Sequence, residues 1–432
     1  MKKEQHLKLK RRGFLSLSAG AAANLIQAPH LSRALAQSDS ATPWGYPLPY
    51  RQVSEKSLAW LKEMGWDPLS VGFFADLPGY AGAYAVIRDL DLLGKRGLPA
   101  KFTSFLSGPP ILEAFIGGQT QATGYGDLPF WTTVARNNPA LAYGVTAVNY
   151  EAAMLVRPDS PLKSIQDIKS QPKPVVIGTL LGSFLEFYVS AAATHWGLEV
   201  GKHYTLAGMS LREAQFLPRG VDAVVSYDPF VSVTLARKIG RKIDDAFPYY
   251  FNKGFVRAEI HQNAPDVVQA LSDAMLEATL YVRQDFDKAV EMYHSDPRVA
   301  TAYSRELFAD QTRKYVTLYK PSFRYLHADF WAAQDVVVAK SQYEKKRMPR
   351  ELSVADMKAS FIPDYMANSL SHAGFTVPAK PVFLPPDWTG EIGKPPYPAY
   401  LNFASMSEPQ PFPEKGDLTR PWTVGGKTFN PG

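Results

Sequence analysis

The chain has 432 residues, of which 46% are hydrophobic and 20% are charged, and it contains no cysteine. This length and composition predict two or three globular domains and exclude a wholly disordered chain. The absence of cysteine excludes a disulfide framework, a thiolate metal site and a cysteine nucleophile. The formal net charge of +6 suggests a polyanionic partner, but the distribution of that charge argues against one.

The positive charge is concentrated at the N-terminus. Residues 1–36 contain seven of the 47 lysines and arginines and one of the 41 acidic residues, so 40 residues of each sign remain. A body without net charge has no bulk electrostatic attraction to nucleic acid or to anionic membranes. We therefore predict no nucleic-acid partner. We interpret a local basic patch at Arg237, Lys238, Arg241 and Lys242 as a solvated helix end.

Residues 1–36 have the three parts of an export signal. A basic segment ends at the pair Arg11 and Arg12, a short apolar segment follows, and an Ala-Leu-Ala sequence ends at Ala36. The arginine pair followed by Gly-Phe-Leu is typical of a twin-arginine signal. The apolar segment is too short to span a bilayer. We expect cleavage near Ala36, a periplasmic location and no membrane-spanning segment afterwards; a basic amphipathic helix is the alternative.

Alternating strands and helices are predicted after an N-terminal extension. The extension, residues 37–69, holds one helix at 55–64. Strands are then expected at 69–74, 101–105, 121–125, 141–149 and 152–157, with helices at 81–93, at 111–116 and up to 136. A second alternation has strands at 174–178, 203–206 and 222–226 and helices at 161–168, 184–196 and 211–216. This pattern predicts an α/β fold with mostly parallel sheets.

The last third of the chain has a different pattern. Residues 264–371 have a helical pattern, and residues 375–432 carry twelve of the 35 prolines, interleaved with aromatic residues. A disordered tail would be poorer in aromatics. We therefore interpret 375–432 as an extended arm packed on the body. The arm is either a structural strap or a segment that reaches a partner or borders the ligand site.

Four loops each follow a predicted strand and open a predicted helix: residues 76–80, 107–110, 126–129 and 182–183. In open α/β sheets, ligands bind in the crevice at the carboxyl ends of the strands. Helix N-termini offer unpaired N–H groups and a positive dipole end there, which suits an anion. Ser107 and Asp127 are also good N-cap residues, so either could have a purely structural role.

The ordered motifs in this part of the chain resemble a known family. They are SGPPILEAFIGG from Ser107, GYGDLP from Gly124, VRPDSPLKSIQDI from Val156, Gly182 with Ser183, and VDAVVSYDP from Val221. Their order is similar to that in the nitrate/sulfonate/taurine group of ABC-transporter substrate-binding proteins, which includes binders of thiamine precursors. The resemblance covers about residues 70–290. Residues 37–69 and the C-terminal arm depart from the family pattern.

The resemblance implies a periplasmic-binding-protein type II fold, in which two α/β lobes close over a ligand like a hinge. Lobe one is expected at residues 70–155 and 229–374 and lobe two at 156–228, with crossings near Arg157 and Tyr227. The closed form would be the one that a permease recognises.

The family's cleft positions correspond here to Asp76, Tyr80, Ser107, Gly108, Asp127, Gly182, Ser183 and Asp228. Aromatic walls are expected from Phe73, Phe74, Tyr125 and Phe130. Helix-end donors favour nitrate, a sulfonate or a carboxylate. The three aspartates would instead favour a cationic or amine-bearing ligand if they face the cleft. We expect a small organic anion, aromatic in character.

No motif of a reactive centre is present. The sequence has no HExxH, no G-x-S-x-G and no P-loop, so we expect no catalytic residue, no metal and no cofactor. The expected function is that of a monomeric solute-binding component that delivers its ligand to an ABC permease and its ATPase. The alternatives are an exported enzyme on the same scaffold and a sensory binding protein.

Overall fold

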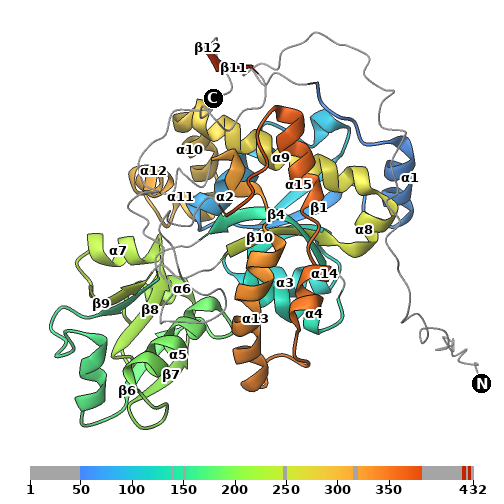
Figure 1. Ribbon diagram of the computed structural model, residues 1–432. Coiled ribbons are helices and arrows are strands. Elements are labelled where there is room, and N and C mark those ends of the chain that lie inside the picture. Colours follow the sequence, from blue (N-terminus) through green and yellow to red (C-terminus); the bar gives the residue numbers. More distant parts are fainter. Residues whose placement is uncertain are drawn as a thin grey trace, which may run out of the picture. The chain divides into compact units, whose positions relative to one another are not determined.

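A computed structural model describes residues 49–138, 140–148, 152–246, 251–314, 320–381, 421–424 and 427–429 (Figure 1). The predicted signal and residues 37–48 of the predicted extension lie outside the described residues, as does most of the predicted arm. In the described part of the chain, no helix is long and apolar enough to cross a membrane.

The first of two five-stranded sheets contains the strands that come first in the chain. Its order is β2 (Ala100–Phe105), β1 (Leu69–Phe74), β3 (Ala122–Gly126), β10 (Phe251–Arg257) and β4 (Ala140–Val148). β1 is parallel to β2 and β3, whereas β10 is antiparallel to β3 and β4. Every residue of β1 is buried, as expected for a strand covered on both faces of its sheet.

Helices from distant parts of the chain pack on this sheet. They are α2 (Pro78–Asp89), α3 (Gly108–Ile116), α4 (Asp127–Ala135), α8 (Ala258–Asn263), α9 (Pro265–Gln284) and α15 (Asp364–Ala373). Phe255 of β10 lies at the centre of the packing, with ring centroids of Phe115, Tyr125 and Phe130 4.5–5.0 Å away in edge-to-face geometry. Such contacts stabilise the core beyond the apolar area that they bury.

The second sheet has the order β7 (Tyr204–Gly208), β6 (Val175–Thr179), β8 (Ala223–Tyr227), β5 (Ala152–Val156) and β9 (Arg241–Ala246). β6 is parallel to β7 and β8, whereas β5 is antiparallel to β8 and β9. Its helical elements are η2 (Ile165–Ser170), α5 (Phe184–Trp196), α6 (Leu211–Ala214) and α7 (Phe230–Ala236). The Ser183 hydroxyl caps α5 by accepting the Leu185 N–H at 3.2 Å.

The predicted α/β fold with two lobes is confirmed. We call the first sheet with its helices lobe one and the second sheet with α5, α6 and α7 lobe two. Both sheets are mixed, because in each of them one strand, β10 or β5, runs antiparallel to both of its neighbours.

The strand pairings put the crossings between sheets elsewhere than expected. The chain changes sheet between β4 and β5 and again between β9 and β10, whereas the sequence indicated crossings near Arg157 and Tyr227. No strand is expected from the sequence after residue 229, because β9, with the sequence RKIDDA, lacks an apolar alternation. The sequence does not predict the pairing partners of these strands. In the structure, β9 pairs with β5, and β10 pairs with β3 and β4.

The rest of the described chain is mostly helical. Its elements are α1 (Glu55–Glu63), η1 (Gly94–Arg96), α10 (Phe286–His294), α11 (Pro297–Ala300), α12 (Arg305–Lys314), η4 (Pro321–Arg324), α13 (Ala328–Glu344), α14 (Val354–Ala359) and the paired strands β11 (Trp422–Val424) and β12 (Lys427–Phe429). A fully buried ion pair between Arg96 and Glu277, 2.7 Å apart, connects η1 to α9.

Candidate functional site

A small cavity lies where strand ends and helix starts of both lobes meet. Its lining residues are Phe74, Gly108, Pro109, Tyr125, Gly126, Pro129 and Asn252 from lobe one and Leu180, Ser183, Phe184 and Tyr227 from lobe two. Its volume is about 30 Å³, close to the volume of one water molecule. Pockets for small molecules usually have about 300–1,000 Å³. A ligand of several atoms can therefore enter only if the two lobes move apart.

Two predicted site residues, Gly108 and Ser183, line this cavity from different lobes. Gly108 is the first residue of α3, and Ser183 is the N-cap of α5. Gly126, the N-cap of α4, lines the cavity as well. Three helix N-termini therefore border the cavity, and the positive ends of their dipoles favour a negative charge there.

The predicted aromatic walls are found in part. Phe74 and Tyr125 line the cavity. Phe73 instead stacks on Tyr84 with the ring centroids 5.9 Å apart, and Phe130 is buried in the core of lobe one. Successive side chains of a strand point to opposite faces of its sheet, so Phe73 and Phe74 cannot both face the cavity.

Two further predicted residues, Gly182 and Ser107, adjoin lining residues in the chain but do not line the cavity themselves. The backbone N–H of Gly182 donates to Glu186 Oε2 at 2.8 Å, and Gly182 has φ of +73°, which favours glycine. Ser107 is the N-cap of α3 but accepts no side-chain capping hydrogen bond. Tyr80 belongs to α2, and its side chain lies outside the described residues.

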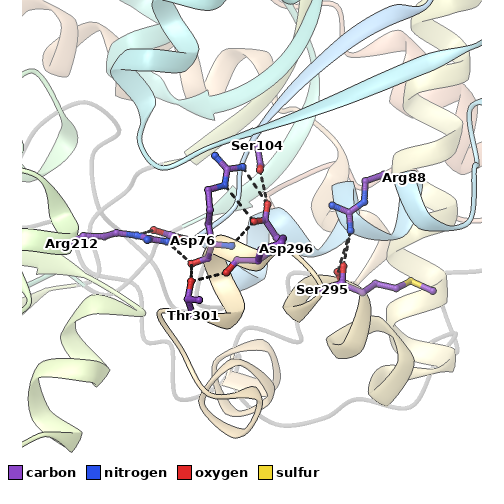
Figure 2. Close-up of polar contacts among 10 residues, drawn as sticks. Asp76, Arg88, Ser104, Arg212, Ser295, Asp296 and Thr301 are labelled. Carbon is purple, nitrogen blue, oxygen red and sulfur yellow. Dashed lines mark hydrogen bonds and ion pairs between the residues drawn. The ribbon is translucent and has the colours of Figure 1, made fainter.

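Asp76 is fully buried and is held by an arginine of the other lobe (Figure 2). Arg212 of α6 donates one hydrogen bond to each Asp76 carboxylate oxygen, both at 2.9 Å, and another to the Arg298 carbonyl oxygen at 3.0 Å. Burial raises the pKa of Asp76, and the guanidinium of Arg212 lowers it in part. Bidentate pairs of this kind are among the stronger hydrogen bonds in proteins. Asp76 therefore connects the lobes and is not among the residues that line the cavity.

A second ion-pair group also connects the lobes. The buried Glu186, in the first turn of α5, accepts a hydrogen bond from Arg347 and has an oxygen 3.6 Å from Lys345 Nζ. Both cations follow α13, which packs on α4 and α14, and Lys345 also donates to Ser190 Oγ at 2.7 Å. Glu186 thus links the loop at Gly182 to lobe one.

The other two predicted aspartates are buried and are not among the residues that line the cavity. Asp228 accepts hydrogen bonds from the backbone N–H and the hydroxyl of Ser232, at 3.1 and 2.7 Å. Asp127 is the first residue of α4 and accepts the Leu128 N–H at 2.7 Å. No charged side chain is therefore among the described residues that line the cavity. The expectation that these aspartates attract a cationic ligand has no support in this geometry.

Several lining residues escaped the sequence analysis. Phe184 and Tyr227 are adjacent in the chain to the predicted residues Ser183 and Asp228. Including the neighbours of each motif in the prediction would therefore have found them. Asn252 lies on β10, and no local pattern predicts that strand or its position. In the described part of the chain, no group of three or more His, Asp or Glu side chains is arranged to hold a metal ion.

Comparison with known proteins identifies the class of fold. No family model and no curated protein sequence matches the chain. The fold is that of ABC-type periplasmic binding proteins, with similar solved structures that each cover about two thirds of this chain or more. The resemblance to the nitrate/sulfonate/taurine group is confirmed at the level of the fold.

Two of the similar structures bind sulfonates and one binds nitrate. The alkanesulfonate-binding protein SsuA from Xanthomonas axonopodis pv. citri, bound to MOPS, has a TM-score of 0.54 and 18% identity, and covers 68% of this chain and 97% of its own. The aliphatic sulphonate-binding protein SsuA from Escherichia coli has a TM-score of 0.54 and 19% identity, and the match covers 67% of this chain and 96% of that protein. The nitrate-binding protein NrtA from Synechocystis has a TM-score of 0.57 and 13% identity, and the match covers 72% of this chain and 91% of that protein.

Proposed function

We propose that this chain is the solute-binding component of an ABC importer. It captures a small organic anion of the sulfonate, nitrate or aromatic carboxylate class between its lobes and delivers it to a membrane permease with its ATPase. The observation that carries the proposal is the cavity lined by both lobes, in a fold shared with sulfonate-binding and nitrate-binding proteins.

The chemistry of the cavity supports this ligand class. The positive ends of the α3, α4 and α5 dipoles favour an anion, and no acidic side chain is among the described lining residues. Few first-turn N–H groups are available as donors, because proline has none and the Leu128 and Leu185 N–H groups donate to Asp127 and Ser183. Phe74, Tyr125, Phe184 and Tyr227 offer flat apolar contact to an organic group. The described lining residues also include no histidine, lysine or carboxylate, which favours binding over catalysis.

The same proposal includes export and a monomeric state. The twin-arginine pattern and the Ala-Leu-Ala sequence before Gln37 support secretion to the periplasm, with cleavage near Ala36.

A thermal-shift screen of residues 37–432 tests the proposal. The panel comprises nitrate, alkyl and aryl sulfonates, aromatic carboxylates and pyrimidines, with mass spectrometry to detect products. A ligand at 100 times its dissociation constant adds about 2.7 kcal/mol to the stability of the native state. We expect one anion class to stabilise the protein without turnover. Product formation would make the protein an enzyme, and stabilisation by pyrimidines alone would contradict the anion class.

The variant Ser183→Trp tests the position of the site. We expect it to abolish binding of every ligand found in the screen, because an indole at the start of α5 cannot fit beside a cavity of about 30 Å³. Ser170→Trp, at an exposed position in the same lobe, is the control and should bind normally. Circular dichroism should show both variants folded. Unchanged affinity of Ser183→Trp would remove this loop from the site.

A further inference from the structure

A cluster of three buried charged residues lies next to the wall of the cavity. Asp127 follows Gly126 in the chain, and Lys253 follows Asn252, and both of these neighbours line the cavity. Asp335 of α13 completes the cluster. The side chains of Asp127, Lys253 and Asp335 are all fully buried. The cluster is therefore close to the proposed ligand but separated from solvent.

The contacts within the cluster leave one carboxyl group poorly compensated. Lys253 Nζ lies 3.2 Å from Asp335 Oδ2, and the indole N–H of Trp131 donates to the same oxygen at 2.6 Å. Lys253 Nζ is also 5.2 Å from the ring centroid of Trp131. One oxygen of Asp127 accepts the Leu128 N–H, and its Oδ2 has no hydrogen-bond partner among the described residues.

The elements packed on α4 bring several other ionisable groups. β10 contributes Arg257, which donates to the Phe115 carbonyl oxygen at 3.1 Å. The remaining ionisable side chains of α13 are exposed: Asp329, Lys340, Tyr343 and Glu344. β3 contributes Tyr125, whose hydroxyl is 2.9 Å from that of Thr133, and β4 contributes Tyr143. α3 contributes Glu113, which pairs with Arg136 at an exposed position. The charges that act on Asp127 are those of Asp335 and Lys253. Two carboxyl groups thus share one ammonium group.

This arrangement favours a proton on Asp127. With both carboxyls ionised, the cluster would carry a net negative charge away from water, and buried groups in that position neutralise instead. Burial raises the pKa of Asp127, as does the charge of Asp335, to about 8 despite the opposite effect of Lys253. At neutral pH the cluster therefore holds a neutral Asp127 beside the ion pair of Lys253 and Asp335.

We propose that Asp127 holds an exchangeable proton beside the ligand cavity and that loss of this proton weakens the capture of an anion there. The inference rests on the proposed function, because it concerns the ligand of the same cavity. An anion in the cavity repels an ionised Asp127 and favours its protonated form. Binding above the titration range of Asp127 therefore takes up a proton from solution.

Calorimetric titration with ethanesulfonate between about pH 6 and about pH 9.5 tests the coupling. We expect the affinity of the native protein to be constant near neutral pH and to fall by up to tenfold per pH unit above about pH 8. The variant Asp127→Asn cannot ionise, and its affinity should not fall in this range. An affinity that rises with pH, or an identical fall in Asp127→Asn, would overturn the coupling.

Urea unfolding without ligand tests the proton site by itself. Asp127 binds its proton more tightly in the native state than in the unfolded state. The folding equilibrium constant of the native protein, relative to that of Asp127→Asn, should therefore fall about tenfold per pH unit from about pH 4 to about pH 8 and then level. The matched control Asp228→Asn also replaces a buried aspartate. Its folding equilibrium constant, relative to that of Asp127→Asn, should show the same pH dependence as that of the native protein. A ratio independent of pH would overturn the proton site.

The two experiments separate the two proposals. One outcome is that no anion of the panel binds at any pH, while the ratio of folding equilibrium constants still stops falling near pH 8. The proposed function then fails, and the proton site on Asp127 is supported. If ethanesulfonate binds but its affinity does not depend on pH, the proposed function stands and the coupling is overturned.

Discussion

Asp76 and Asp127 occupy corresponding places in lobe one. Each follows a strand of the first sheet and lies at or just before the start of a helix, and each is fully buried. Asp76 receives two hydrogen bonds from Arg212, which is 136 residues away in the chain. Asp127 instead lies beside Asp335, whose carboxylate already contacts Lys253. The same residue type in the same local setting thus becomes an interlobe ion pair in one place and a protonated group in the other.

The difference shows how distant partners set the charge of a buried carboxyl group. Burial raises the pKa of both aspartates. A bidentate arginine offsets that effect for Asp76, whereas a second carboxylate adds to it for Asp127. Four substitutions test this contrast, and the one expected to have the largest effect is taken first.

Lys253→Met should destabilise the whole protein. The substitution leaves Asp335 and Asp127 without a cation in a fully buried site, and breaking such a pair typically costs about 3–5 kcal/mol. Urea unfolding at neutral pH measures the loss. Lys62→Met, at an exposed position of α1, is the matched control and should change the stability by less than about 0.5 kcal/mol. A loss below about 1 kcal/mol in Lys253→Met would show that Lys253 does not compensate the two carboxyls.

Arg212→Ala should open the lobes without unfolding either of them. The closed arrangement loses the hydrogen bonds to Asp76, which we put at about 1–2 kcal/mol because Arg212 is 29% exposed. Small-angle scattering should show a larger radius of gyration than in the native protein. Lys202→Ala removes an exposed cation of lobe two whose partner, Glu199, is in the same lobe, and it should have no effect. An unchanged radius of gyration in Arg212→Ala would mean that this pair does not hold the lobes together.

Asp76→Asn and Asp127→Asn should differ at neutral pH. Asp76→Asn removes the charge paired with Arg212 and should cost about 1 kcal/mol. Asp127→Asn should instead stabilise the protein at neutral pH, because the native protein on unfolding releases the proton that the folded state retains on Asp127, and an amide has no such proton to release. Urea unfolding of both variants gives the comparison. Equal losses would contradict the assigned charge states.

The pH dependence of the Asp76 contact has a defined sign. The ion pair with Arg212 exists while Asp76 is ionised, so it is lost as the pH falls through the pKa of Asp76. Because burial raises that pKa, the pair should weaken at a higher pH than an unperturbed aspartate would allow. Scattering on acidification should show the native protein opening, whereas Asp76→Asn should show no such transition. Opening of both proteins at the same pH would assign the transition to another group.

Local patterns predicted much of the framework. The strands that became β1, β6 and β8 have short apolar runs bounded by turn residues, and the helices after β2 and β6 begin at the serine N-caps Ser107 and Ser183. Gly108 and Ser183 were identified for this reason, because a helix start after a strand has a local signature. Both residues line the cavity.

The sequence by itself determined where strands end and helices begin, because periodicity and capping act over a few residues. It also determined which loops meet at the carboxyl ends of the strands. Only the tertiary structure decided that β9 and β10 pair in different sheets and that Arg212 donates hydrogen bonds to Asp76. It also decided that Lys253 forms an ion pair with Asp335, next to Asp127. These outcomes depend on partners far apart in the chain, and a buried side chain takes its charge and its role from such partners.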